Sequence, residues 1–171
     1  MEYIKPTFNF RTYYCLVIIL FAVDSAVGQS TGQEKMEQLN FMIGDWVGIS
    51  TTYQNDTIVQ QVPAHEKISY KLDKNLITID LQSETLKLHT VIYYDDKDAK
   101  YYYNSYYKEG TGKYAAEFKD GKLIVWPNKN KRFVFHLTPK GDFQEYGEKF
   151  ENGKWMKYFE DNFKKSLANQ P

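Results

Sequence analysis

Cysteine is almost absent from this sequence, since Cys15 is the only one among 171 residues. A single cysteine excludes an intrachain disulfide framework and a metal site built from several thiolates. Cys15 also falls within an N-terminal segment that we expect to be removed, which would leave no cysteine nucleophile. A chain without disulfides must be held by its apolar core, and 42% hydrophobic residues, with 15 Tyr and 11 Phe, suffice for one.

An excess of either charge is also lacking, because 22 basic and 22 acidic side chains balance. A neutral chain offers no general electrostatic attraction to nucleic acid or to an anionic membrane surface. We therefore expect no nucleic-acid partner.

The longest apolar run, Tyr13 to Val23, is too short to span a bilayer, which needs about 20 residues. Lys5 and Arg11 precede it, and Ala26 and Gly28 follow at the spacing that a signal peptidase reads. We expect a signal peptide over residues 1–28, export to the periplasm or the exterior, and one mature domain over residues 29–171 without a membrane span. An uncleaved anchor is the alternative.

The remaining chain reads as all-β after a single helical stretch. Met36, Leu39 and Ile43 recur at helical spacing and predict a helix over Gln33 to Ile43. Beyond Trp46, short runs rich in Val, Ile, Thr, Tyr and Phe alternate with polar turns. The turns predicted are 55–56, 73–75, 83–84, 95–98, 110–112, 120–121, 128–130, 139–142 and 152–153.

These nine turns divide the chain into ten strands, and the short connections require neighbouring strands to be antiparallel. A meander of this length exposes two edges unless it closes on itself. The fold class predicted is an all-β, ten-stranded, antiparallel up-and-down barrel with a short N-terminal helix.

Two local patterns resemble the calycin superfamily, which includes lipocalins, fatty-acid-binding proteins and nitrobindin-like barrels. One is the helical turn followed by Gly44-Asp-Trp46, and the other is the segment from Asn152 to Lys165. The second is similar to the last strand of secreted bacterial lipocalin-like domains of uncharacterised function. The resemblance implies that Trp46 packs at a closed barrel end beneath a basic residue of the last strand, Lys164 or Lys165, with Gly44 and Lys164 as structural partners of Trp46.

Chemistry-bearing motifs are sparse. The sequence has no Gly-x-Ser-x-Gly elbow, and no acid, base and nucleophile set is recognisable, so we expect no enzyme.

His65 and His136 fall on polar strand phases, whereas His89 lies on a strand without a clear outer face. A haem-binding, nitrobindin-like barrel would need a late-strand histidine, and none follows Pro139, so we expect no cofactor and no metal. Asp95, Asp96 and Asp98 lack the glycine and closing Glu of a calcium loop.

Glu66 is the sharpest candidate, because alternation places it on the apolar phase with Ala64, Ile68, Tyr70 and Leu72. Buried, it must find hydrogen-bond partners. It is either a satisfied internal carboxylate or a polar anchor in a ligand cavity. Glu145 and Lys157 fall on predicted inward phases too and are its potential partners. The full candidate set for binding is Glu66, Tyr70, Tyr94, Tyr103, Phe118, Phe133, Phe135, Lys157 and Phe159.

Three functions remain open. The first is a secreted lipocalin-like protein that binds a small apolar or amphipathic molecule in its interior. The second is a haem barrel, which requires His89 to face inward. The third is a structural or envelope protein whose barrel is filled by its own aromatic side chains and has no cavity.

Overall fold

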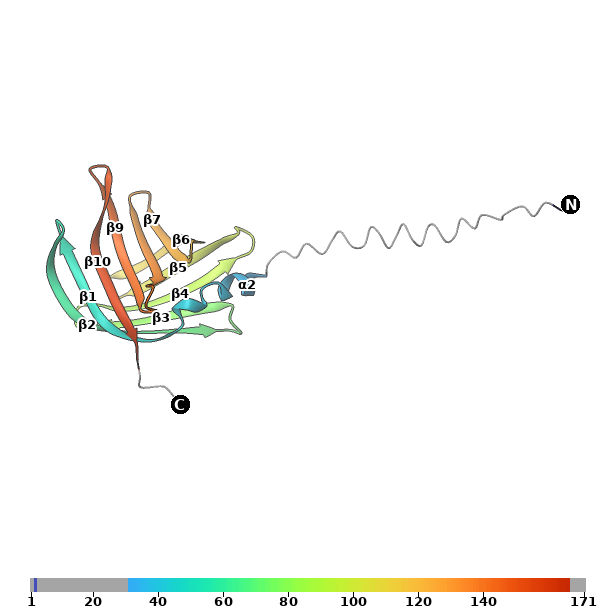
Figure 1. Ribbon diagram of the computed structural model, residues 1–171, viewed down its shortest axis with the longest axis horizontal. Helices are drawn as coiled ribbons and strands as arrows, with labels where there is room; N and C mark the ends of the chain where they lie inside the picture. Colours follow the sequence, from blue (N-terminus) through green and yellow to red (C-terminus); the bar gives the residue numbers. More distant parts are fainter. Residues whose placement is uncertain (1, 3–30, 167–171) are drawn as a thin grey trace. The chain divides into compact units, whose positions relative to one another are not determined.

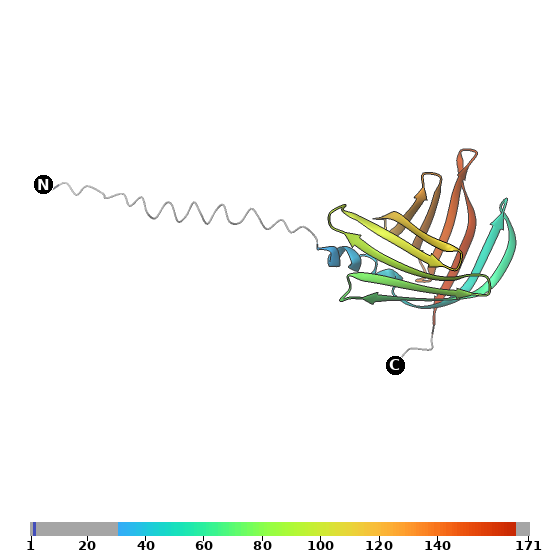
Figure 2. The ribbon, with the colours of Figure 1, turned by 180° about the vertical axis from the view of Figure 1, so that it is seen from behind.

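The computed structural model describes Glu2 and residues 31–166, and the expected signal peptide lies outside this range apart from Glu2. The described part is a closed barrel of ten antiparallel strands in sequential order, with β1 beside β10 (Figure 1). Each arrow runs opposite to its neighbours, which is also visible from behind (Figure 2). The strands are β1 (Gly44–Gln54), β2 (Thr57–Lys71), β3 (Leu76–Ser83), β4 (Lys87–Asp95), β5 (Lys100–Tyr107), β6 (Gly110–Lys119), β7 (Lys122–Asn128), β8 (Lys131–Leu137), β9 (Phe143–Glu151) and β10 (Lys154–Lys165). The predicted fold class is confirmed.

Tight turns enforce this meander. Asn55 and Asp56 both have positive φ between β1 and β2, as do Asp120 and Gly121 between β6 and β7. A two-residue type I′ hairpin turn requires positive φ at both central residues, and its twist matches that of the flanking strands. One turn lies earlier than predicted, since β6 already begins at Gly110.

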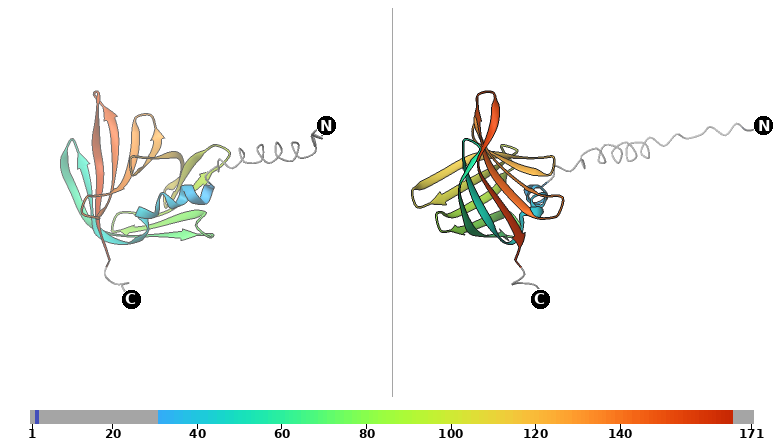
Figure 3. Two further views of the ribbon diagram at one scale, coloured as in Figure 1. Left: turned by 45° about the vertical axis from the view of Figure 1, so that its right-hand side comes forward. Right: turned by 60° about the vertical axis from the view of Figure 1, so that its left-hand side comes forward.

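The predicted helix is interrupted. Helix α2 covers only Gly32–Glu37, and a 3-10 turn, η1, follows at Asn40–Met42. Met36 and Leu39 of the predicted apolar stripe bury completely, whereas Met42 takes the buried place expected of Ile43, which is only partly buried. The blue helix lies at one opening of the barrel, between the green strands and the yellow to orange ones (Figure 3).

Trp46 seals this helix end of the barrel, as predicted. Its indole Nε1–H donates to the backbone oxygen of Met42 at 2.8 Å, and its ring packs on Phe143 with centroids 5.3 Å apart. Gly44 leaves room for the indole, because a Cβ there would lie 2.8 Å from it. The cation above the ring is Lys165, 6.0 Å from its centroid. The choice of Lys164 was wrong, because Lys165 is the residue paired directly with Trp46 whereas Lys164 pairs with Val47.

The interior alternates along most strands as predicted. Ala64, Glu66 and Ile68 are buried in β2, and Ala116 lies between inward Tyr114 and Phe118 in β6. Leu72 is the exception, with 71% of its surface exposed. It follows the end of β2 and has a φ of 48°, so it belongs to the turn and no longer to the strand's alternation.

Strand β10 departs from simple alternation. Lys157 pairs with Glu148, and Phe159 pairs with the next residue of β9, Gly147, so Tyr158 is the extra residue of a β-bulge. A bulge shifts the side-chain phase, because one strand advances two residues against one. The assignment of Lys157 to an inward phase was therefore wrong.

Candidate functional site

The described residues form two hollows. One, of about 430 Å³, lies beside α2 and is lined by Lys35, Gln38, Tyr94, Ala99, Lys100, Tyr101, Ala115, Ala116, Glu117, Phe118 and Trp126. The other, a cavity of about 410 Å³, occupies the end reached by the β1–β2, β3–β4 and β5–β6 turns. Every strand except β7 contributes to its wall. The cavity reaches the barrel rim, where Leu86 and Tyr107 are partly exposed.

Aromatic side chains make most of the apolar wall. Phe133 lies against three other rings, those of Tyr103, Tyr114 and Phe159, with centroid distances of 6.0 to 6.3 Å. The bulge brings Tyr158 to the wall beside Phe159, with centroids 5.2 Å apart. Both rings fit because Gly147 faces them without a side chain: a Cβ there would lie 2.3 Å from Phe159. The full lining is Ser50, Thr52, Ala64, Leu81, Ser83, Thr85, Leu86, Leu88, Tyr103, Ser105, Tyr107, Tyr114, Lys131, Phe133, Phe135, Glu145, Tyr158, Phe159 and Asp161.

Glu66, Glu145 and Asp161, here called the acidic cluster, lie together at the inner end of the cavity. Asp161 is paired across β10 and β9 with Glu145 and across β10 and β1 with Ser50. Glu145 and Asp161 line the cavity, whereas Glu66 lies behind them, paired with Trp46 and Leu81. All three side chains are buried, with 7% or less of each residue exposed.

The pKa of each member of the acidic cluster lies above its usual range. Burial raises the pKa of Glu66 to about 8, and the charge of Asp161 adds to the shift. Burial also raises the pKa of Glu145 well above its ordinary value, followed by the charges of Glu66 and Asp161. The pKa of Asp161 rises through burial, although hydrogen bonds from Glu145 and Ser50 oppose the rise. The hydrogen bond between Glu145 and Asp161 adds to the rise in the pKa of Glu145 and opposes the rise in that of Asp161.

Polar atoms of this cluster remain without partners. Among the described residues, Glu66 Oε2, Asp161 Oδ1 and the Tyr158 hydroxyl are buried and accept or donate no hydrogen bond. No ion pair within residues 31–166 joins the cluster to a basic side chain. Nor do the residues of this range include three or more His, Cys, Asp or Glu side chains arranged to hold a metal ion.

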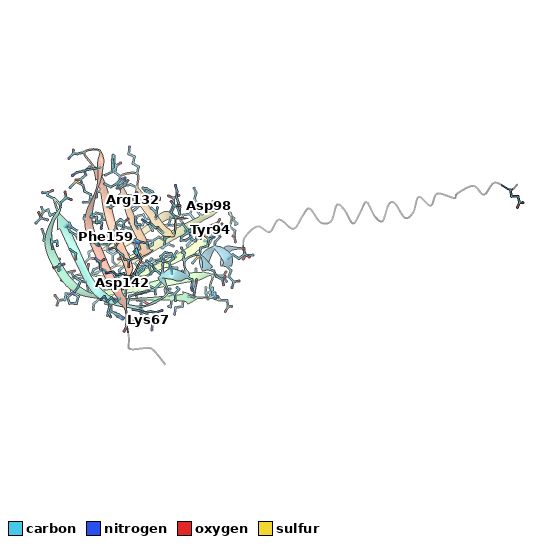
Figure 4. All side chains as sticks on the ribbon, in the orientation of Figure 1. Lys67, Tyr94, Asp98, Arg132, Asp142 and Phe159 are labelled. Atoms are coloured by element: carbon cyan, nitrogen blue, oxygen red, sulfur yellow. The ribbon has the colours of Figure 1, made fainter. Side chains whose placement is uncertain are left out.

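The structure distributes the predicted site residues over three places. Tyr103, Phe133, Phe135 and Phe159 line the cavity, and Glu66 lies directly behind it. The other predicted aromatic residues are at the helix end, where Tyr70 donates to Met36 O, Phe118 packs on Phe41, and Tyr94 packs on Tyr101. Figure 4 shows Tyr94 close to α2 and Phe159 well apart from it.

Lys157 is on the outside, which corrects its inward assignment. Its Nζ donates to Glu160 and lies 4.7 Å from the ring centroid of Tyr146. The reason is the bulge at Tyr158. Lys157 therefore does not partner Glu66.

The histidines all lie on the outer surface. His89 Nδ1 is 2.6 Å from Asp80 Oδ1, and the side chain is 47% exposed. His65 contacts Asp45, and His136 contacts Gln144. The condition for the haem alternative, an inward His89, is not met.

Asp161 was missed from the sequence, although a usable pattern existed. It shares the phase of Phe159 and Phe163, as Glu145 shares that of Phe143. The serine and tyrosine residues of the cavity wall could not be recognised in this way, because Ser and Tyr occur on both faces of these strands.

The architecture defines the class of protein: a closed ten-stranded antiparallel barrel with an interior cavity at one end. No protein family model matches the chain, and no curated protein matches it. Among solved structures, the chain is similar to a protein of unknown function from the DUF3598 family of Nostoc punctiforme. The identity is 8%, with 80% of this chain and 100% of that one covered and a TM-score of 0.28.

Proposed function

We propose that this protein binds a small, largely apolar molecule in the interior of its barrel. The observation that carries the proposal is the cavity of about 410 Å³, which lies within the size range of small-molecule sites, roughly 300–1,000 Å³. Its wall combines aromatic and aliphatic side chains with a few convergent polar groups, as such sites do. A barrel acting only as a filled scaffold would have had this space occupied by its own side chains.

The class of binder proposed is a lipocalin-like member of the calycin superfamily. Support comes from the closed sequential barrel, the N-terminal helix over one end, and Trp46 between Gly44 and Lys165. Cation and indole recur in that arrangement because a charge above the ring face is attracted by its quadrupole.

We also propose that the protein is exported. Support comes from the sequence of residues 1–28, with its basic start, its 11-residue apolar run and the small residues at 26 and 28. No helix among the described residues is long and apolar enough to cross a membrane. N-terminal sequencing of protein recovered outside the cytoplasm should begin near Gln29, and an intact Met1 on that protein would contradict export by cleavage.

A neutral fluorescent probe tests the binding proposal. N-phenyl-1-naphthylamine should gain fluorescence on titration with native protein and bind with a single site. Ala64 lines the cavity, so Ala64→Phe should fill the space and weaken probe binding. Val47 is 43% exposed on β1 and does not line the cavity, so Val47→Phe is the control and should leave binding unchanged.

Two results would count against an interior site. One is no fluorescence gain with folded wild-type protein. The other is equal probe binding by wild type and by a folded Ala64→Phe variant, because a surface site would not sense that change.

A further inference from the structure

The chemistry at the inner end of the cavity specifies more than an apolar ligand. A cavity made only for a hydrocarbon has no use for carboxyl groups, since each buried polar group without a partner costs free energy. Here Glu145 and Asp161 reach the cavity, and Glu66 stands behind them. A buried Asp161 oxygen and the buried Tyr158 hydroxyl, both on cavity-lining residues, have no hydrogen-bond partner.

Among residues 31–166, no basic side chain forms an ion pair with the acidic cluster. Lys131 is the basic side chain of the cavity wall, and it begins β8 near the rim. Its Nζ lies 4.8 Å from the ring centroid of Tyr158 and 5.6 Å from that of Phe133. No described ion pair links Lys131 to an acidic residue.

We propose that the ligand is an amphipathic amine, whose ammonium group is held by Glu145 and Asp161 while its apolar body lies among the rings of Tyr103, Phe133 and Phe159. This inference rests on the proposed interior binding function. An ammonium group offers the N–H donors that a carboxyl pair, an unpartnered Asp161 oxygen and a tyrosine hydroxyl accept. Charge-assisted hydrogen bonds of this kind are stronger than neutral ones.

The opposite orientation of charge fits less well. An anionic ligand would have to place its head at Lys131 near the rim and its apolar tail against the acidic cluster. That pose leaves buried polar oxygens facing hydrocarbon, whereas the amine pose gives them donors. The arrangement of charges along the cavity therefore selects amine over acid.

Binding of an amine must be coupled to proton release. Burial raises the pKa of Glu145 and of Asp161, which favours their protonated forms in the free protein. The groups that face this pair are Glu66 from β2, Tyr103 from β5, Tyr114 from β6 and Tyr158 from β10, with Lys131 from β8 toward the rim. None of them supplies a positive charge next to the pair, so an arriving ammonium favours the ionised cluster and expels a proton.

The test compares three ligands that share one apolar body: 4-phenylbutylamine, 4-phenylbutan-1-ol and 4-phenylbutyrate. Calorimetric titration at pH 7.5 should show the amine binding at least about tenfold tighter than the alcohol. The butyrate should bind most weakly. Titrations of the amine in buffers of different ionisation enthalpy should reveal proton release, which the alcohol should not cause.

Substitutions in the acidic cluster test whether Asp161 and Glu145 cause the preference for amine over alcohol. Asp161→Asn and Glu145→Gln should reduce the preference for amine over alcohol to within about threefold while the alcohol still binds. Glu151→Gln removes an exposed carboxylate from β9, the strand that carries Glu145, and should leave the preference intact.

The outcomes separate the two proposals. Equal binding of all three ligands, or tightest binding of the butyrate, would overturn the amine inference and leave the binding function standing. Binding of none of the three, together with no response of the neutral probe, would overturn both. Since proton release is measured on the wild-type protein, the inference remains testable even if an acidic-cluster variant fails to fold.

Discussion

Gly147 is the residue that lets β10 present two aromatic rings to the cavity. Tyr158 and Phe159 are adjacent in sequence, and both pack where a side chain at residue 147 would stand. An ideal Cβ at Gly147 would lie 2.3 Å from Phe159 and 2.6 Å from Tyr158. The wall of the cavity thus depends on a missing side chain.

Gly147→Ala should destabilise the protein by about 1–3 kcal/mol, the usual cost of overpacking. Gly110→Ala is the matched control, because the nearest atom to its added Cβ is the Tyr107 hydroxyl at 4.0 Å and its φ is not positive. It should be neutral or slightly stabilising, since alanine narrows the unfolded ensemble. Urea unfolding measures both, and equal effects would contradict the packing described at Gly147.

Glu66 sets a second prediction at this scale, on the pH dependence of stability. Its pKa rises from 4.5 to about 8 on folding, so between these values the folded state binds more protons than the unfolded chain. The free energy of unfolding must then fall as pH rises from about 4.5, and level off above about 8. Glu145 and Asp161 act in the same direction.

Glu66→Gln should flatten part of this slope, by up to about 1.4 kcal/mol per pH unit. The free energy of unfolding of the variant should therefore rise relative to that of wild type as pH increases. Urea unfolding between pH 5 and 9 measures this difference. Glu151→Gln, at an exposed position of β9, is the control for loss of one carboxylate. A difference between Glu66→Gln and wild type that does not change with pH would show that Glu66 is ionised throughout.

At the scale of the element, η1 and α2 close the barrel through three residues with no exposed surface, Met36, Leu39 and Met42. The sequence predicted Met36 and Leu39 on this buried face, but it placed Ile43 there and not Met42, and it did not predict the break between the two helical turns. Helical spacing cannot report a tertiary contact such as the hydrogen bond that the Trp46 indole donates to Met42 O after the break.

Leu39→Ala should cost about 2–5 kcal/mol, because it removes a fully buried side chain from this plug. Asn40→Ala changes the adjacent exposed residue and should stay within about 0.5 kcal/mol of wild type. The comparison is again made by urea unfolding. If both variants behaved alike, the helical segment would not be closing the barrel.

Strand β10 shows where alternation fails as a guide. Period two predicted the inward faces of β2 and β6, because those stretches are regular. It misplaced Lys157, because one extra residue at Tyr158 reverses the phase, and nothing in the types of residues 154–158 marks the bulge. Period-two alternation correctly placed Glu145 of β9 inside the barrel.

At the scale of the whole molecule, the ten strands followed from turn chemistry, and closure followed from the need to pair two edges. The sequence did not predict which inward residues pack at the helix end and which line the cavity. The pattern shows that Tyr94 and Phe133 both face inward, but only packing decides that one belongs to the helix end and the other to the cavity. The candidate set consequently mixed core and cavity residues.

The central claim is that the barrel takes up a small molecule in the cavity at the end away from its helix. Methyl resonances report it directly during a titration with 4-phenylbutan-1-ol, whose neutral head makes the result independent of the amine inference. Leu81 and Leu88 line the cavity, whereas Leu39 and Leu123 are fully buried and do not. We expect saturable shifts of the methyl resonances of Leu81 and Leu88, with little change at Leu39 and Leu123. Shifts confined to outward residues, or no shifts at saturating alcohol, would contradict it.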